Sequence, residues 1–286
     1  MTGLWRPPGP TKSTPCPNRN PEGVAAIMEI SVPDLDDLKY AKSMLEHPGL
    51  AIKIVNVIGI PIEKGIEILP ENWVKIVQSS TQKALEAALN SAILTIKNEP
   101  KAAAANSLHK IMAAGSGAAG GFMGLPALPI ELPISTTIMM RSIADIARSE
   151  GHSLSEPRVK IACMEVFALG GPGKDDDGAE TSYFAIRSGL AKTVRDAAQF
   201  IAQKGITGKS SPVILKLISQ VSSRFGIQVS EKIAAQAIPL IGAAGGAIVN
   251  TLFIDHFQNM ARGHFIVLRL EEKYSPELVC AVYNSL

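Results

Sequence analysis

The sequence predicts an all-α protein, a multi-helix bundle with a central helical hairpin rich in glycine and alanine. Apolar residues recur at helical spacing along most of the chain. No segment shows the apolar–polar alternation, enriched in β-branched residues, that is typical of a strand. The pentapeptide Gly-Ala-Ala-Gly-Gly occurs twice, each time inside an uncharged run. A chain of 286 residues is long enough to bury a large core.

Residues 1–27 differ from the rest of the chain, with six prolines and almost no apolar run. Such a segment cannot bury enough apolar surface to offset the entropy lost on ordering, so we expect a disordered, proline-rich tail. It also lacks the apolar core of a secretory signal peptide. We expect a single helical domain in residues 28–286.

Helix signals follow one another through the first part of this domain. Asp34 stands at the start of a helix that the Pro48-Gly49 pair ends. Further on, apolar residues keep the helical period, and they predict amphipathic helices separated by short breaks. These helical segments are expected over 50–69, 71–98 and 102–114.

The second part of the domain is predicted to be helical as well. After a segment rich in glycine and proline, Ser135 is a natural N-cap and Gly151 a natural stop. Pro157 suits the first turn of the next helix, which the glycines at 170–173 end. The helices expected here span 135–151, 155–170, 178–204, 212–225 and 230–274.

Composition argues against nucleic acid as a partner. The net charge is only +2, no cluster of Lys and Arg forms a basic face, and aromatic residues make up 5% of the chain. Mean hydropathy is +0.17, which is high for a soluble protein. The cysteines are three in number and far apart, so we expect neither a disulfide framework nor a metal clip, and a reducing, cytoplasmic setting.

The segment Gly115-Ser116-Gly117-Ala118-Ala119-Gly120 fits the dinucleotide-binding pattern G-x-G-x-x-G. That pattern needs a strand before the first glycine and a helix that opens at the last one. Here a helix-forming segment precedes the glycines, and three prolines follow them. We therefore predict that no nucleotide binds, and no other cofactor is indicated.

The repeated pentapeptide favours a steric role for its glycines. Small residues four apart make a flat helix face on which another backbone can lie closely. Glycine costs about 1 kcal/mol against alanine inside a helix, so several glycines together imply tight packing as compensation. We expect helix–helix contacts at Gly117, Gly121, Gly124, Gly242 and Gly246.

The two uncharged runs, 111–130 and 233–254, are long enough to span a bilayer. Pro126 and Pro129 interrupt the first run, and the second holds the polar residues Gln236 and Asn250. Prolines free backbone groups that lipid cannot satisfy. Three alternatives stay open: a buried hairpin in a soluble core, an autonomous membrane span, and peripheral or conditional insertion.

The C-terminal run 250–274 carries polar residues on a helix that is apolar all round, which implies burial. Asp255, Arg262 and Arg269 are seven apart and share one stripe. A buried arginine needs a carboxylate, and several candidates exist. These are Asp255, Glu272, Glu131, Asp145 and Glu165.

Two interpretations of these polar residues remain open. One is a structural polar network inside the core, which we expect to include Arg141, Tyr183, Arg187, Asn250, Arg262 and Arg269. The other is a hydrolase that uses Asp255, His256 and His264 as an acid–base constellation. A metal site is not expected, because His-x7-His is not a ligand spacing and no His-Glu-x-x-His motif occurs.

The block PLIGAAGGAIVNTLFIDHFQNMARGHFIVLRLEEKY resembles the C-terminal signature of the EcsC family. GFMGLPALPIELPISTTIMMRSIADIARSEG resembles the central block of that family, and VFALGG followed by AETSYFAIRSGLAK resembles its third. The resemblance covers roughly 30–285. The residues shared with these blocks are Gly121, Gly124, Pro126, Pro129, Pro133, Arg141, Tyr183, Arg187, Asn250, His256, Phe257, Met260, Ala261, Arg262, His264 and Arg269. Leu268 departs from the pattern, which has a basic residue before Arg269.

What this resemblance implies for function is modest. The family is named from a bacterial operon that also encodes an ABC-type transporter, and no agreed biochemical activity is attached to it. The resemblance implies a membrane-associated accessory protein, at the inner face of the cell membrane, with a membrane surface or a transporter subunit as its partner. The alternatives are the hydrolase and a soluble protein-interaction module.

Overall fold

A computed structural model describes residues 29–46, 49–91, 128–171, 183–205, 211–238 and 242–286 of the chain. Every regular element in these ranges is a helix, which confirms the all-α prediction. The expected tail 1–27 and the expected helix 102–114 lie outside the described residues. The elements are α2 (Val32–Leu45), α3 (Leu50–Ile58), α4 (Glu63–Ile66), α5 (Trp73–Ser91), α7 (Leu128–Ser149), α8 (Pro157–Glu165), η2 (Val166–Ala168), α9 (Tyr183–Lys204), α10 (Pro212–Ala237), α11 (Gly242–Lys273) and α12 (Pro276–Ser285).

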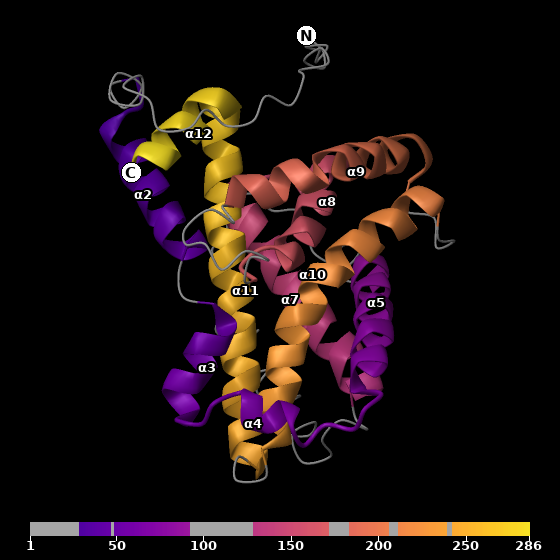
Figure 1. The fold of residues 1–286 in the computed structure, drawn as a ribbon. Coiled ribbons are helices and arrows are strands. Elements are labelled where there is room, and N and C mark those ends of the chain that lie inside the picture. Colours follow the sequence, from indigo (N-terminus) through magenta and orange to yellow (C-terminus); the bar gives the residue numbers. More distant parts are fainter. Residues whose placement is uncertain (1–28, 47–48, 92–127, 172–182, 206–210, 239–241) are drawn as a thin grey trace.

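The axis of the bundle is α11, which runs from one end of the molecule to the other, with α10 antiparallel to it (Figure 1). Four phenylalanine rings meet between α10, α11 and η2: Phe225 lies with its centroid 4.9 Å from Phe167, and Phe253 lies 5.2 Å from Phe257. All four rings are buried. Aromatic burial of this kind contributes strongly to a core, so the α10–α11 hairpin is where the fold is anchored.

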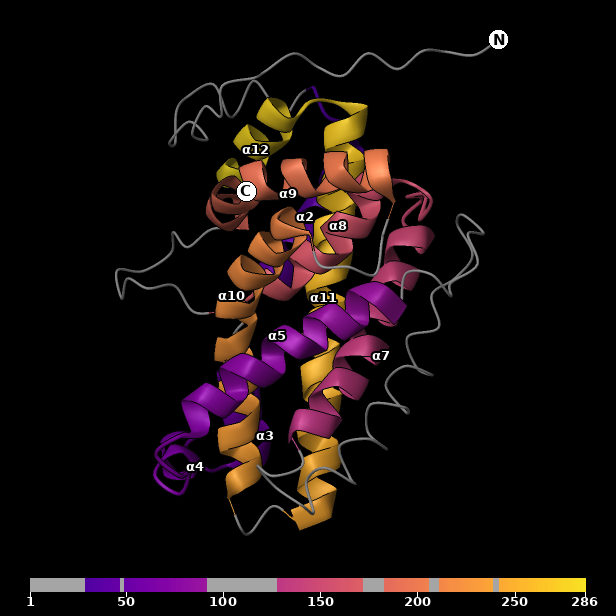
Figure 2. The same cartoon turned by 90° about the vertical axis from the view of Figure 1, so that its right-hand side faces the viewer.

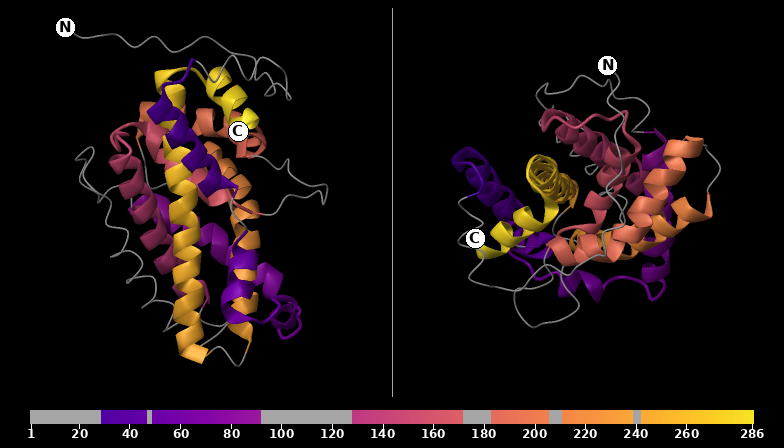
Figure 3. Two further views of the ribbon diagram at one scale, coloured as in Figure 1. Left: turned by 90° about the vertical axis from the view of Figure 1, so that its left-hand side faces the viewer. Right: turned by 90° about the horizontal axis from the view of Figure 1, so that it is seen from above.

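The remaining helices cover this hairpin from three sides. α5 lies across α10 and α7, as the side view shows (Figure 2). α2 lies along the upper part of α11, and α12 folds back beside it (Figure 3). α3 and α4 contact α10 and α11 near the turn between those two helices, whereas α8 and α9 lie toward the other end (Figure 1).

Several helix boundaries predicted from glycine and proline are confirmed. α7 stops just before Gly151 and α9 just before Gly205, and both glycines adopt the left-handed conformation, with φ of 97° and 69°. α8 and α10 each begin with a proline, Pro157 and Pro212.

Other boundaries were predicted wrongly. Ser135 does not cap α7; it lies inside that helix and its hydroxyl donates to the Leu132 carbonyl at 3.2 Å. The helix starts at Leu128 and accommodates Pro133, because its buried face holds these first turns in place. α10 continues through 225–230 without a break, and α12, which Ser275 caps, was not predicted at all.

The uncharged run 233–254 is not one helix. Its first residues end α10 at Ala237, and its last residues belong to a separate helix, α11, which begins at Gly242. Within the described part of the chain, no helix combines the length and the apolar character that crossing a bilayer would need. Of the predicted packing glycines, Gly242 opens α11 and Gly246 is buried in its second turn, whereas Gly117, Gly121 and Gly124 lie outside the described residues.

Cys163 and Cys280 differ in their bonding state. Cys163 is a free thiol in the core, and burial raises its pKa to about 12. Cys280 on α12 is disulfide-bonded, contrary to the expectation that no cysteine is paired.

Candidate functional site

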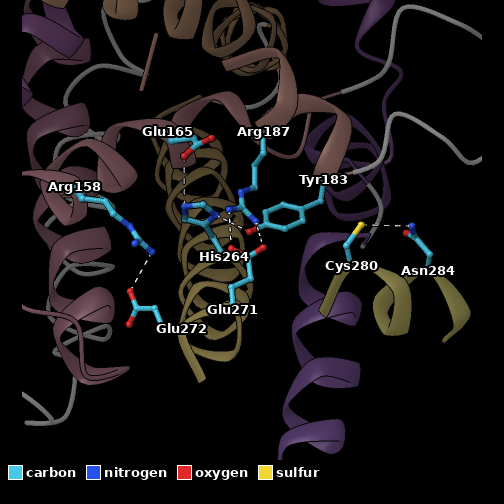
Figure 4. Close-up of polar contacts among 9 residues, drawn as sticks. All are labelled: Arg158, Glu165, Tyr183, Arg187, His264, Glu271, Glu272, Cys280 and Asn284. Carbon is cyan, nitrogen blue, oxygen red and sulfur yellow. Dashed lines mark hydrogen bonds and ion pairs between the residues drawn. The ribbon is translucent and has the colours of Figure 1, made fainter. Parts of the chain in front are cut away.

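A group of buried polar contacts lies where α8, α9 and α11 meet (Figure 4). The Tyr183 hydroxyl is 2.9 Å from Nδ1 of His264. The Arg187 guanidinium donates two hydrogen bonds to the Glu271 carboxylate, at 2.6 and 2.9 Å. We call this group the His264 cluster; its members are Glu165, Tyr183, Arg187, His264 and Glu271.

Helix geometry explains why these side chains converge. Tyr183 and Arg187 are four apart at the start of α9, so they share one face, and the guanidinium lies 5.2 Å from the tyrosine ring centroid. His264 and Glu271 are seven apart on α11 and share a face as well. Tyr183 therefore contacts His264, and Arg187 contacts Glu271.

Burial dominates the electrostatics of the His264 cluster. It lowers the pKa of His264 well below its ordinary value, and the positive charge of Arg187 adds to this effect. Burial also raises the pKa of Glu165 to about 7, with Arg187 acting in the opposite direction. The imidazole is thus neutral at physiological pH, and Glu165 is close to its titration midpoint.

His256 lies on α11 about 12 Å before His264, at eight residues of 1.5 Å each. It is fully buried, and neither ring nitrogen makes a hydrogen bond of good geometry within the described residues. The backbone of Gly170, whose φ is 72°, lies against the imidazole. Burial, together with the charge of Lys53, lowers the pKa of His256 to about 3.

We expect Gly170→Ala to destabilise the protein by about 2 kcal/mol, from left-handed strain plus a clash. A Cβ at this position would lie 2.6 Å from Nε2 of His256 and 2.7 Å from the sulfur of Met260. Gly205→Ala is the matched control, because its φ is 69° and nothing lies within 4 Å of an added Cβ. Urea unfolding of both variants measures the difference. Equal losses in the two variants would mean that the His256 contact contributes nothing.

The surroundings of His256 and His264 do not bring Asp255, His256 and His264 together as the acid–base group of a hydrolase. Asp255, which is half-buried, raises the pKa of His256 only weakly against burial, and His264 belongs to a separate cluster. An effective general base has a pKa near the working pH, and both imidazoles lie below that range. The arrangement therefore favours structural roles for Asp255, His256 and His264.

The arginines of α11 find partners that the sequence did not indicate. Arg269 bonds to Asp37 of α2 at 2.8 Å and lies 3.7 Å from Glu150, which follows α7. None of the five carboxylates proposed from the sequence pairs with Arg269. Arg262 is half-buried. Burial raises the pKa of Glu150, and the charges of Arg269 and Arg262 oppose this rise. Arg141 is half-buried on α7.

A second buried ion pair joins α7 to α10 near the turn of the hairpin. Nζ of Lys232 lies 2.8 and 2.9 Å from the two carboxylate oxygens of Glu131, and the Asn250 amide donates to the same carboxylate at 3.1 Å. Lys232 has no exposed surface. The signals in the sequence were a lysine that borders the uncharged run 233–254 and a glutamate that stands between apolar residues, and we did not predict their pairing.

The family model described as the EcsC protein family matches residues 38–270. The match covers most of the chain. The chain belongs to the EcsC family. Comparison with curated proteins and with solved structures gives no match.

Four of the residues that carry the EcsC resemblance take part in the contacts just described. Tyr183, Arg187 and His264 form the His264 cluster, and Asn250 reaches the Lys232–Glu131 pair. At Leu268, where the family pattern has a basic residue, the side chain is buried in the core, so a charge there would need a partner. In the described residues no group of three His, Cys, Asp or Glu side chains is placed to hold a metal ion.

Proposed function

We propose that this EcsC protein is a membrane-associated accessory protein that docks on a lipid bilayer with one end of its bundle. The observation that carries the proposal is the distribution of exposed aliphatic side chains. Eight of the twelve large apolar residues that are exposed in the described ranges belong to α3, to α4 and the residues just after it, or to the first turns of α5, α7 and α11. They are Ile52, Val57, Ile66, Ile68, Val74, Ile130, Ile134 and Ile248.

These elements gather at the end of the bundle where α10 turns into α11 (Figures 1 and 2). The Lys232–Glu131–Asn250 contact sets the first turns of α7 at the same level as this turn. We call the eight side chains the apolar end. Contiguous exposed aliphatic patches are uncommon on monomeric proteins and mark membrane or protein contacts, so the shared location of these elements supports docking at this end.

Charge at the apolar end fits insertion into lipid rather than attraction to a charged surface. In the first half of α7, the end of α10 and the first half of α11 before Asp255, the charged residues are Glu131, Glu231 and Lys232. Glu131 and Lys232 form an ion pair in the interior, and burial raises the pKa of Glu231 to about 7. Around α3 and α4 the basic residues Lys53, Lys64 and Lys75 are balanced by Glu63, Glu67 and Glu71. Binding should therefore depend on apolar area and little on salt.

The EcsC family relation supports the biological setting of this proposal. We infer that the protein acts at the inner face of the cell membrane, beside a transporter of the ABC type. An accessory protein that binds lipid directly would be held close to such a transporter without a large protein interface. A soluble interaction module, with a protein on the apolar end, is the contrary outcome of the test.

Flotation of the full chain with liposomes tests the proposal. We expect co-flotation with phosphatidylcholine vesicles, alone or mixed with phosphatidylglycerol, that persists at high salt. Ile68→Ser combined with Ile130→Ser should weaken binding about ten-fold or more, because two largely exposed isoleucines no longer enter the acyl region.

The control removes exposed apolar residues elsewhere. Val32→Ser combined with Ile227→Ser changes side chains that are 73% and 39% exposed but lie outside the apolar end. Its flotation should equal that of the unchanged protein. Absence of flotation with every vesicle, or an equal loss in both double variants, would contradict the docking proposal.

A further inference from the structure

A gap of 3.9 Å separates the Glu165 carboxylate from Nε2 of His264, where α8 faces α11 (Figure 4). Both side chains are buried, and within the described residues Nε2 of His264 makes no hydrogen bond. The Glu165 carboxylate is the acidic group that faces this nitrogen. The other ring nitrogen, Nδ1, is bonded to the Tyr183 hydroxyl. Buried polar groups without a partner are costly, so this gap needs an explanation.

Two proton arrangements satisfy all three side chains. When Glu165 is protonated, its O–H can donate to Nε2, and then Nδ1 carries the ring proton and donates to the tyrosine oxygen. When Glu165 is ionised, Nε2 must carry the ring proton and donate to the carboxylate, and the Tyr183 hydroxyl turns to donate to Nδ1. The imidazole is neutral in both arrangements, and only its tautomer differs.

We propose that Glu165, His264 and Tyr183 form a proton-linked switch, in which the protonation of Glu165 selects the tautomer of His264. Ionisation releases one proton from the Glu165 carboxyl to solvent. The ring keeps its single proton, which moves from Nδ1 to Nε2 through exchange with solvent. Either arrangement requires Glu165 to approach the ring by about 1 Å, to reach the 2.7–3.2 Å of an ordinary hydrogen bond.

The charged groups around the switch place its midpoint in the physiological range. From α9, Arg187 favours the ionised carboxylate; from α11, Glu271 opposes it; and Arg158 of α8 favours it again. Burial outweighs them and raises the pKa of Glu165 to about 7. On the His264 side, Arg187, His152 and Arg158 all disfavour a second proton on the ring, which keeps the imidazole neutral while Glu165 titrates.

The switch lies at the opposite end of the bundle from the apolar end (Figure 1). It joins α8 to α11 directly and α9 to α11 through Tyr183. A change in the protonation of Glu165 therefore alters the contacts that hold α8 and α9 against α11. This effect does not depend on whether the apolar end binds lipid.

Nitrogen-15 NMR of the full chain, labelled at histidine, tests the inference. We expect the single ring proton of His264 on Nδ1 at pH 6 and on Nε2 at pH 8, and a midpoint near neutrality. In Glu165→Gln the tautomer should be the same at both pH values, because the residue no longer titrates. Glu231→Gln is the matched control: Glu231 is also a largely buried carboxyl whose pKa burial raises to about 7, but it contacts α3 instead.

The unchanged protein alone can overturn the inference, so the result does not depend on how well a variant folds. One tautomer throughout the range from pH 6 to pH 8 would refute it. An imidazolium with protons on both nitrogens at pH 6 would also refute it, since His264 would then titrate by itself. A tautomer change that persists in Glu165→Gln would show that another group drives it.

Discussion

Lys232→Met is expected to destabilise the protein by about 3–5 kcal/mol at neutral pH, the usual cost of removing one partner from a buried ion pair. Methionine fills nearly the same volume, so the loss arises from the Glu131 carboxylate, which would stay buried without its cation. Only the side-chain hydrogen bonds from Asn250 and Ser135, which carry no charge, would remain among the groups that lower its pKa. Urea unfolding followed by circular dichroism measures the change.

The pH dependence gives this prediction a second, independent test. Burial acts to raise the pKa of Glu131, but Lys232 prevails and holds it below the ordinary value. In the unchanged protein the ion pair therefore stabilises fully above the ordinary carboxyl range and is lost as the pH falls through the lowered pKa. In Lys232→Met, burial is opposed only by the hydrogen bonds from Asn250 and Ser135, so the pKa of Glu131 rises. The deficit should therefore be largest at neutral pH and shrink toward acid, where Glu131 protonates.

Two further variants distinguish the effect of the unpaired Glu131 charge from the effect of replacing a lysine side chain. Lys232→Met combined with Glu131→Gln removes both charges and should recover most of the lost stability. Lys216→Met changes an exposed lysine of the same helix and should alter stability by about 0.5 kcal/mol or less. If the double variant is no more stable than Lys232→Met alone, the cost does not come from an unpaired carboxylate.

The helices of this protein could largely be predicted from local signals, whereas the contacts between them could not. Gly151, Gly205, Pro157 and Pro212 act through their own backbone, so their effect is visible in the sequence. The prediction at Ser135 was wrong because this serine follows a segment rich in glycine and proline, and we interpreted it as the N-cap of a new helix. Burial of Leu132 and the ion pair of Glu131 hold those turns helical instead.

Local signals in the sequence were also insufficient to predict which partners the polar residues contact. Helical spacing showed that Tyr183 and Arg187 share a face, and that Arg262 and Arg269 share another. It could not show which helix each face meets. Asp37, the partner of Arg269, lies 232 positions away in the sequence. Periodicity gives the orientation of a side chain about its own helix axis, and partner choice depends on how the helices cross.

Close helix packing through glycine was predicted, but the structure shows it most clearly at Gly65, a residue that the sequence did not single out. A Cβ at this residue of α4 would lie 1.8 Å from the carbonyl oxygen of Ala234 in α10 and 2.5 Å from its carbonyl carbon. These are backbone atoms of a long helix and cannot swing aside. α4 would have to move away from α10 to admit even one methyl group.

We therefore expect Gly65→Ala to cost about 3 kcal/mol or more, at the upper end of overpacking effects. Gly226→Ala is the matched control in α10, because nothing lies within 4 Å of its added Cβ. There the better helix propensity of alanine should stabilise the protein by up to about 1 kcal/mol. Opposite signs for two glycine-to-alanine changes, measured by urea unfolding, would establish that Gly65 is required by the contact of α4 with α10. A gain or no change in Gly65→Ala would mean that α4 is free to shift, and the position of α4 in the apolar end would need revision.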